Sequence, residues 1–349
     1  MLDRPGYTAI DLRPLAGDAG TSAYSVSDNE FVVGESGSTP ARWNREGDPS
    51  ALAVLDGYSG GRACGVNKTG AIAGILHIGD DLRPVRWDPT GEVQGLELPD
   101  GTVSGAVNRI NERGSMLGGA MEPGYRWRAV RWTSEGRLME LEPLTVGGET
   151  QAHDLNELDE VAGTAKDVSG VRTAVRWSGS GEVSRLPSPR RATACCVNDE
   201  GVVAADGVSW SRDGRATLLT GGPAFRAGQT LKITNTGATI GWGATTDGQQ
   251  IGVRWNRSGE PTVLPPLPLD TASTCFDIND AGLVVGESAG GTTVRPVWWD
   301  ENAAPHPLPS PDGLDAIVAQ HITTTGNVII GYGYDRARAT YRGIAWYRS

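Results

Sequence analysis

The sequence has few of the residues that hold metals or form disulfides. Its 349 residues include four cysteines and four histidines, and these form no HxH, HExxH or paired CxxC pattern. We therefore predict no metal site and no cofactor. The cysteines are Cys64, Cys195, Cys196 and Cys275, and we expect them to be reduced, as is usual in the cytoplasm. A redox pair formed by Cys195 and Cys196 is the alternative.

An excess of positive charge and long apolar runs are also missing. The net charge is −11 and no basic cluster is visible, which excludes the surface that a nucleic-acid partner requires. No segment approaches the roughly 20 apolar residues that cross a bilayer. Residues 1–6 have neither a basic start nor an apolar stretch. We therefore expect no secretory signal, no membrane association and a cytoplasmic location.

Glycine, by contrast, is abundant, and many of the 49 glycines have fixed places in a phrase that recurs along the chain. One copy runs from Ala63 to Gly74 (ACGVNKTGAIAG) and continues as RPVRW from Arg83 to Trp87. The final Gly of the ACGVNKTGAIAG stretch has a counterpart in every copy, at Gly34, Gly74, Gly118, Gly163, Ala205, Gly241, Gly286 and Gly331. The tryptophan recurs as Trp43, Trp87, Trp132, Trp177, Trp210, Trp255, Trp299 and Trp346. Such self-similarity indicates stacked copies of one supersecondary unit.

Turn residues divide each copy into four short strands. Repeats of roughly 40–50 residues with four strands each are typical of β-propeller blades. We predict an all-β fold in which residues 1–349 form one domain, an eight-bladed β-propeller of four-stranded antiparallel blades, with seven blades as the alternative. The last copy ends one strand short at Ser349. Residues 7–15 are predicted to supply that strand and close the ring.

Two residue types inside the phrase are interpreted as architectural. The Asn of the phrase, as at Asn67, is expected to cap its own turn. The arginines beside the tryptophans are expected to stack on an aromatic ring or to hydrogen-bond a blade edge, rather than to bind an anion. They are Arg42, Arg86, Arg131, Arg176 and Arg254.

The phrase A-x-x-(V/I)-N-x-x-G-x-(V/I)-x-G followed by R-A-V-R-W-x-x-x-G resembles the HAF-repeat family of predicted propellers, named for a His-Ala-Phe triplet before the tryptophan. The resemblance extends from about Ala23 to Trp346. In this chain the triplet reads RAV at residues 128–130 or TAV at residues 173–175, so the His and Phe are replaced. The resemblance implies the propeller architecture, and it carries over no catalytic residue.

Candidate functional residues are sought where the copies differ, on the first strand of each blade, which lines the central channel of a propeller. Two residues before the Asn position, five copies carry an ionisable side chain other than cysteine, and the fourth copy adds a histidine one residue earlier. The candidate catalytic residues are Arg109, His153, Asp154, Lys232, Asp277 and His321.

Two interpretations of these channel residues are open. Arg109 can pair with Asp154, and Lys232 with Asp277, only to neutralise charge in a wet channel. Alternatively, a carboxylate beside an imidazole provides an acid/base pair, and a nearby cation stabilises developing negative charge. Under that interpretation the group of His321, Asp277 and Lys232 is preferred over the group of His153, Asp154 and Arg109.

A ligand at the channel mouth would meet the loops between strands two and three and the neighbouring channel positions. Aromatic and acidic residues at these places suit a flat or apolar small ligand, although ordinary loop packing would also leave them there. The candidate ligand-binding residues are Tyr24, Glu35, Asn108, Tyr125, Trp127, Trp242, Phe276, Glu287, Gln320 and Tyr332. In the fifth copy only Asp206-Gly207 separates the two strands, and we expect a notch there through which the ligand enters.

Two functions follow from these features. In the first, the protein is a cofactor-independent acid/base enzyme that acts on a small organic molecule by cyclisation, elimination or hydrolysis, in a pathway such as secondary metabolism. In the second, it is a non-enzymatic propeller whose rim docks another protein. The ionisable residues on the first strands favour the enzyme, which we expect to be a monomer with no nucleic-acid or membrane partner.

Overall fold

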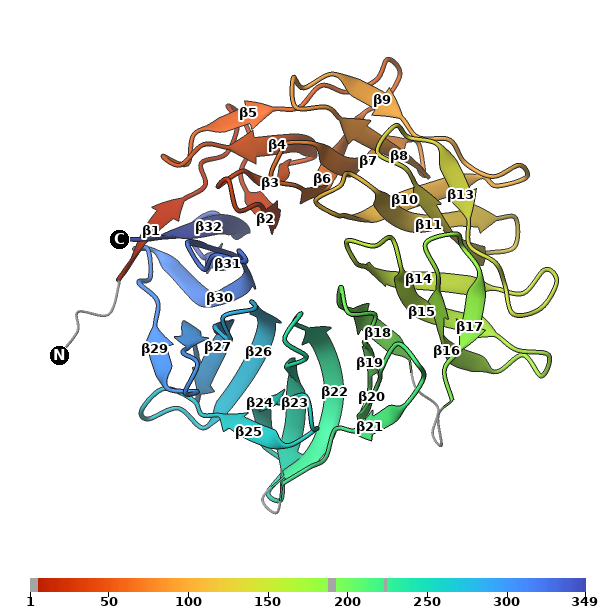
Figure 1. Cartoon of the computed structure of the whole chain (residues 1–349). Helices are drawn as coiled ribbons and strands as arrows, with labels where there is room; N and C mark the ends of the chain where they lie inside the picture. The colour runs from red at the N-terminus through yellow and green to blue at the C-terminus, as the bar shows by residue number, and fades with distance from the viewer. Residues whose placement is uncertain (1–5, 188–192, 223–224) are drawn as a thin grey trace.

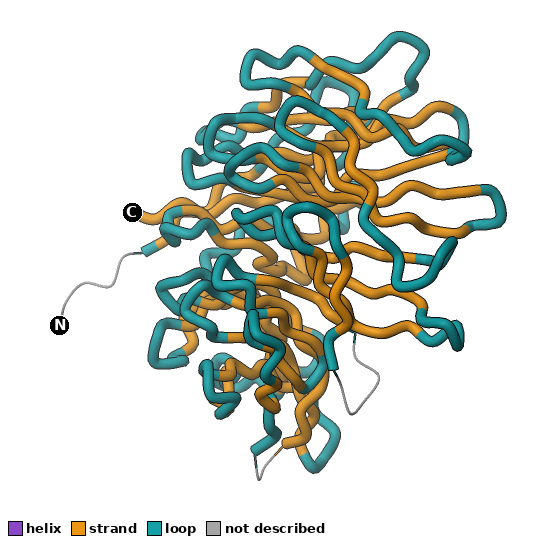
Figure 2. The backbone as a smooth tube through the Cα atoms, turned by 45° about the vertical axis from the view of Figure 1, so that its right-hand side comes forward, coloured by secondary structure: helices purple, strands orange, loops and turns teal. Residues whose placement is uncertain are grey.

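The computed structural model describes residues 6–187, 193–222 and 225–349, and these residues form strands and loops without a helix (Figure 2). The stretch that includes residues 1–5, from which we predicted the lack of a secretory signal, lies mostly outside this range. Eight sheets of four antiparallel strands stand in a ring around a common axis (Figure 1). The predicted all-β, eight-bladed propeller is confirmed, and the seven-bladed alternative is wrong. In the described part of the chain, no helix could cross a membrane.

Each blade runs from an inner strand at the axis to an outer strand at the rim of the ring (Figure 1). The inner strands are β2 (Thr21–Val26), β6 (Gly60–Val66), β10 (Ser104–Ile110), β14 (Thr150–Leu155), β18 (Ala194–Val197), β22 (Phe225–Ile233), β26 (Ala272–Ile278) and β30 (Leu314–Ile322). The second strands are β3 (Val32–Ser36), β7 (Ile72–Ile78), β11 (Met116–Glu122), β15 (Val161–Lys166), β19 (Val203–Ala205), β23 (Thr239–Thr245), β27 (Val284–Gly290) and β31 (Val328–Asp335).

The two remaining strands of each blade complete the sheet toward the rim. The third strands are β4 (Thr39–Trp43), β8 (Asp81–Trp87), β12 (Arg126–Trp132), β16 (Arg172–Trp177), β20 (Val208–Trp210), β24 (Gln250–Trp255), β28 (Thr293–Trp299) and β32 (Thr340–Arg348). The outer strands are β5 (Pro49–Ala51), β9 (Val93–Gly95), β13 (Leu138–Glu140), β17 (Val183–Arg185), β21 (Ala216–Leu218), β25 (Pro261–Leu264), β29 (Pro305–Pro307) and β1 (Tyr7–Asp11). We number the blades 1 to 8 from the one that contains β2.

The N-terminal strand closes the ring, as predicted. Strand β1 pairs antiparallel with β32, so the first strand of the chain is the outer strand of blade 8 (Figure 1). The strand ends at Asp11 rather than at residue 15. Beyond it, the backbone N–H of Leu12 donates to the carbonyl of Gly343 in blade 8. The backbone N–H of Arg13 donates to the carbonyl of Gly47 in blade 1. The closing segment therefore joins blades 8 and 1.

The repeated tryptophans fix each blade to the one before it. Each of the eight indole rings is buried, and its Nε1–H donates to a backbone carbonyl of the preceding blade, from 2.6 to 2.8 Å away. Trp87, for example, bonds the carbonyl of Ala53. The apolar core is accordingly divided among the interfaces between blades, where one cluster joins Trp43 to Val328 and Ile330. A buried donor that finds its acceptor in the neighbouring blade fixes the spacing of the ring.

Four of the five arginines beside the tryptophans, Arg86, Arg131, Arg176 and Arg254, donate to backbone carbonyls of the next blade. Arg131 donates to the carbonyls of Asp159 and Gly179, and Arg254 donates to those of Gly282 and Glu301. Of the two architectural roles that we proposed from the sequence, hydrogen bonding to a blade edge is therefore the one found in the structure.

The Asn of the phrase has two functions, of which the sequence analysis found one. The side-chain oxygen of Asn156 caps its own turn by accepting the N–H groups of Leu158 and Glu160. Its amide nitrogen donates to the carbonyl of Asn198, 2.8 Å away in blade 5, and the amide nitrogen of Asn198 donates in turn to the carbonyl of Thr234 in blade 6. These bonds form a belt that joins the inner turns of successive blades.

Candidate functional site

The inner strand of every blade is bulged at the same place. The pairing of inner and second strands slips by one residue at a position three before the Asn of the phrase, in all eight blades. The extra residues are Tyr24, Cys64, Asn108, His153, Cys195, Leu231, Phe276 and Gln320. The two candidate positions of the sequence analysis are therefore the bulge residue and the residue that follows it. A bulge re-aims a side chain and adds local twist to the strand.

A cavity of about 350 Å³ lies among these bulges. Five of the six candidate catalytic residues line it, namely Arg109, Asp154, Lys232, Asp277 and His321, together with the candidate ligand-binding residues Tyr24, Asn108 and Phe276. His153 and Gln320 do not belong to its lining. We call this space the channel cavity. Its wall also includes turn residues such as Asp28 and Glu112, so the candidate charges lie toward the end of the channel where strands one and two connect.

Asp277 is the best-connected ionisable group in the channel cavity. Its side chain is 5% exposed, whereas Lys232 and His321 beside it are 43% and 45% exposed. Oδ1 contacts the Nζ of Lys232 and Oδ2 lies 3.6 Å from the Nδ1 of His321. Burial opposes ionisation of the carboxyl, but the charges of Lys232 and His321 outweigh it and hold the pKa of Asp277 below its ordinary value. The predicted group of His321, Asp277 and Lys232 is present.

The second predicted group is looser. The Nε of Arg109 lies 3.8 Å from the Oδ1 of Asp154, and burial raises the pKa of that carboxyl although Arg109 opposes the shift. His153 has a buried Nε2 without a hydrogen-bond partner, and no contact joins it to Asp154. Burial and the nearby Arg109 lower the pKa of His153. His153 and Asp154 therefore do not form an acid/base pair, because adjacent residues around a bulge need not face each other.

The channel carboxylates also join adjacent blades. Asp277 Oδ2 accepts the backbone N–H of Ile322 at 3.1 Å, and Asp154 Oδ2 accepts that of Val197 at 3.0 Å. Ser25 accepts the N–H of Val66 in the same way. The sequence analysis missed this role, which supports the architectural interpretation for the two aspartates but leaves Lys232 and His321 without such a function.

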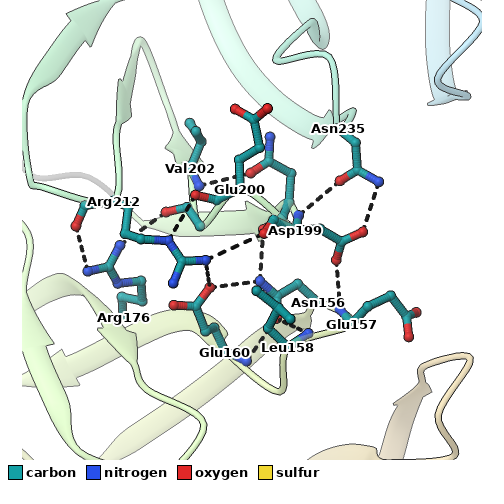
Figure 3. A network of polar contacts seen from close by, with 12 residues as sticks. Asn156, Glu157, Leu158, Glu160, Arg176, Asp199, Glu200, Val202, Arg212 and Asn235 are labelled. Atoms are coloured by element: carbon teal, nitrogen blue, oxygen red, sulfur yellow. Dashed lines mark hydrogen bonds and ion pairs between the residues drawn. The ribbon is translucent and has the colours of Figure 1, made fainter.

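A ring of carboxylates at the inner turns was also missed. The residue directly after the Asn position is acidic in five blades. In four of them, all but Asp28, the carboxylate accepts a backbone N–H of the preceding blade. The donor is the residue at the same repeat position. Glu157 and Asp199 illustrate the contact, with a distance of 2.8 Å (Figure 3). The ring comprises Asp28, Glu112, Glu157, Asp199 and Asp280. Alignment of the copies would have found it, since the acidic residues recur at one fixed position.

The remaining candidate ligand-binding residues are not brought to one mouth. Trp127 lines a cavity of about 230 Å³ between blades 3 and 4, and Glu35 one of about 250 Å³ near Thr340. Gln320, Tyr24 and Tyr332 share a cavity of about 250 Å³, whereas Glu287 and Tyr332 share another of about 560 Å³. Tyr125 and Trp242 line none of these spaces.

The candidate aromatic residues and the charged residues are therefore not gathered around one cavity of the structure. The charged residues precede the turn from strand one to strand two, whereas Trp242, Glu287 and Tyr332 each follow the Gly of the phrase, near the middle of the second strands. With about 3.3 Å of rise per residue, these positions are separated along the channel.

The fifth blade has the short connection that the sequence indicated. Asp206-Gly207 joins β19 to β20, but blades 1, 2 and 7 also have two-residue connections here. The difference is that β19 and β20 have three residues each, whereas β27 and β28 have seven. The hairpin of blade 5 therefore projects less far because its strands are short.

The cysteines form no disulfide in the structure. All four cysteines of the chain are free, and the Sγ atoms of Cys195 and Cys196 lie 3.3 Å apart. Burial, and then the neighbouring Cys195 thiol, raise the pKa of the Cys196 thiol well above its ordinary value, which lowers its reactivity. Among the residues that the structure describes, no group of three or more His, Cys, Asp or Glu could hold a metal ion.

Comparison with solved structures identifies the class of fold. Oligogalacturonate lyase in complex with manganese superposes with a TM-score of 0.57 at 10% sequence identity, over 99% of both chains. A catalytically inactive virginiamycin B lyase from Staphylococcus aureus with quinupristin gives 0.51 at 13% identity, over 97% of this chain and 99% of that one. Puromycin hydrolase gives 0.53 at 14%, over 94% of this chain and 62% of that one. No protein-family model and no curated protein sequence matches the chain. At these identities the similarity establishes the propeller fold alone.

Proposed function

We propose that this protein is an enzyme that transfers protons on a small polar organic molecule bound in the channel cavity. The proposal is carried by the group around Asp277, in which a buried carboxylate contacts two half-exposed groups that face the same cavity, Lys232 and His321. A structural ion pair would need only one cation. The imidazole adds a group that can accept a proton and return it.

Each residue of this group has a role in the proposed reaction. His321 takes a proton from the substrate and returns it to the leaving group or product. Asp277 stays ionised because the charge of Lys232 outweighs burial and lowers its pKa, and its negative charge stabilises the imidazolium that forms on His321. Lys232 and Arg109 are positioning residues that attract an anionic group of the substrate, and they stabilise negative charge that develops on it.

The reaction class is an elimination, with hydrolysis and cyclisation as the other proton-transfer reactions that this group can perform without a cofactor. Two of the propellers with similar folds are named as lyases and one as a hydrolase, which supports testing elimination first and hydrolysis second. The substrate is proposed to enter over blade 5, whose hairpin projects least. We also propose that the enzyme is a cytoplasmic monomer.

The test is a comparison of metabolite depletion by the protein and two histidine variants. The wild-type protein is incubated with an extract of small metabolites, and substrates and products are followed by mass spectrometry. We expect His321→Ala to lose turnover by about a hundredfold or more, the usual contribution of a general acid/base group. The matched control, His77→Ala, changes a histidine that does not line the channel cavity and should retain turnover. Equal turnover by His321→Ala would contradict the proposal.

The alternative function is a docking scaffold, favoured by one observation. Tyr125 is 83% exposed at the turn between β11 and β12, where an aromatic side chain without a packing partner suits a protein interface. If wild-type protein depletes no metabolite, and Tyr125→Ala removes partners that wild type captures, the scaffold replaces the enzyme.

A further inference from the structure

The largest of the cavities described above is not the channel cavity. It has a volume of about 560 Å³ and lies between blades 7 and 8, where its wall includes Glu287, Asp315, Tyr332, Tyr334, Arg336 and Tyr341. We call it the tyrosine cavity. It shares no lining residue with the channel cavity, so whatever it binds is held apart from His321 and Asp277.

Three tyrosine rings line the tyrosine cavity. Tyr332 and Tyr334 are two residues apart on β31 and therefore lie on the same side of the sheet. Tyr341 stands on β32 directly opposite Tyr334. Its ring centre is 5.4 Å from that of Tyr332 at 88°, and 5.3 Å from that of Tyr334 at 64°. The rings therefore pack edge to face, and their faces point in different directions along the wall of the cavity.

One carboxylate in the tyrosine cavity has no counter-ion. Arg336 is paired with Asp315 at 2.5 Å. Among the described residues no Lys, Arg or His forms an ion pair with Glu287, which is half-buried on β27. Burial raises the pKa of Glu287, and a hydrogen bond from Thr274, which lowers it, only partly offsets this. Burial, followed by the charge of Glu287, also raises the pKa of Tyr332, so carboxylate and ring lie in one environment.

The backbone beside the tyrosine cavity is unusual. Strand β30 slips in register a second time between Asp315 and Val318, in addition to the bulge that it shares with the other inner strands. Within this slip Ala316, which lines the cavity, has φ of 47°, a left-handed conformation that non-glycine residues seldom adopt. Such strain persists where the surrounding structure holds it, and it is concentrated at ligand sites.

We propose that the tyrosine cavity binds an organic ammonium ion, in which an alkylammonium or trimethylammonium group lies among the tyrosine rings and beside Glu287. The faces of aromatic rings attract a cation, and several rings around one cation form the cage that recognises quaternary ammonium groups. Glu287 supplies the opposite charge. This site is independent of the proton-transfer function proposed for the channel cavity.

Other ligand classes fit the charges less well. A neutral aromatic compound would bury Glu287 further without neutralising it, which is unfavourable for an unpaired charge. An anion would be repelled by Glu287 and would have to displace Asp315 from Arg336. A small inorganic cation would find only one unpaired carboxylate, while the three rings would offer it few of the oxygen ligands that it prefers.

The test compares choline with its uncharged isostere, 3,3-dimethylbutan-1-ol, by calorimetric titration of the full-length protein. The two probes have the same shape and differ in charge, so a cation site binds choline and discriminates against the alcohol. We expect affinity for choline to fall by about tenfold in Glu287→Gln and in Tyr341→Ala, since each removes one part of the cage. Affinity should rise with pH as Glu287 ionises, because its raised pKa moves the ionisation upward.

Two control variants separate the cage from general effects. Glu182→Gln removes an exposed carboxylate, and Phe31→Ala removes a partly exposed ring, and neither residue lines the tyrosine cavity. Both should bind choline as wild type does. The proposal is overturned if the alcohol binds as tightly as choline, if wild type binds neither probe, or if Glu287→Gln and Tyr341→Ala, shown to be folded by circular dichroism, retain full affinity. None of these outcomes depends on turnover, so they leave the channel proposal to its own experiment.

Discussion

Asp154 and Asp277 occupy the same position in blades 4 and 7, and each accepts one backbone N–H of the following blade. Their pKa values nevertheless move in opposite directions. Asp277 contacts Lys232 and lies near His321, so attraction outweighs burial and its pKa falls. For Asp154 burial outweighs the attraction of Arg109, whose Nε is 3.8 Å away, and its pKa rises. The difference lies in the partners rather than in the position.

This contrast predicts different effects of removing the two charges. A carboxyl whose pKa is lowered in the folded state from 3.8 adds stability above that pH and loses it as the pH falls further. At pH 7 we therefore expect Asp277→Asn to lower the free energy of unfolding by about 3 kcal/mol, because it leaves Lys232 without its counter-charge. The deficit should shrink as the pH falls below 3.8. Urea denaturation at several pH values measures both effects.

Asp154→Asn is the matched control. A carboxyl whose pKa is raised from 3.8 destabilises the folded state above that pH, so removal of its charge relieves a cost at pH 7. The amide oxygen can still accept the N–H of Val197. We expect the free energy of unfolding to change by less than about 1 kcal/mol, in either direction. Equal losses in Asp154→Asn and Asp277→Asn would show that the two sites are not electrostatically distinct.

Among the elements, β1 is the strand whose partner is most distant along the chain. It pairs with β32 over five residues, from Tyr7 opposite Arg348 to Asp11 opposite Ile344. The Tyr7 hydroxyl donates to the carbonyl of Gly326 at 2.7 Å, and Arg342 is paired with Asp11 and Asp335. Trp43 completes the closure by donating to the carbonyl of Arg13. Side-chain bonds thus reinforce the backbone ladder of this strand.

Removal of β1 should therefore open the ring. A chain that begins at residue 16 would expose the edge of β32, remove Asp11 from Arg342, which keeps only Asp335, and leave the indole N–H of Trp43 without its acceptor at Arg13. We expect the free energy of unfolding to fall by more than about 3 kcal/mol, the range of effects seen when a buried network is broken. A synthetic peptide of residues 1–15, added in excess, should restore part of the lost stability by mass action. Thermal denaturation with and without the peptide measures this, and a scrambled peptide serves as the control.

If the shortened chain unfolds at the same temperature as the full chain, closure by β1 contributes little. If it is destabilised but neither peptide restores it, the loss comes from exposed edges rather than from a specific strand partner.

At the scale of the whole molecule, the repeat made the fold predictable because its residues are the ones that each blade needs. Trp87 and Asn67 recur since every blade must be joined to its neighbours, so the number of blades and the ring closure could be inferred from the sequence. The channel position of Asp277 and His321 followed from that architecture.

The features that could not be predicted from the sequence depend on distances between blades. Whether Asp154 is charged, whether His153 meets its neighbour and which rim aromatics share a cavity are decided by bulges and by side chains tens of residues away. Tyr341 illustrates this, because the sequence analysis did not select it although it stands among Tyr332, Tyr334 and Glu287. Tertiary proximity of this kind leaves no periodic signal.

The blades also differ in the length of their strands, and this difference predicts which blade opens first. Blade 8 joins the two ends of the chain, a feature that by itself would make it the weakest blade. Yet in blade 8 β30, β31 and β32 have nine, eight and nine residues, whereas in blade 5 β18 has four and β19, β20 and β21 have three each. Shorter ladders have fewer hydrogen bonds to break, so local opening of blade 5 costs less free energy.

We therefore expect amide hydrogens of β19 and β20 to exchange roughly tenfold or more faster than those of β31 and β32 in native conditions, since exchange reports the free energy of local opening. Hydrogen exchange followed by mass spectrometry of peptides from the two blades measures the order. The second and third strands of blade 2, β7 and β8, have seven residues each and serve as an internal reference of intermediate length. Faster exchange in β31 and β32 than in β19 and β20 would mean that the chain ends, rather than the short blade, limit the stability of the ring.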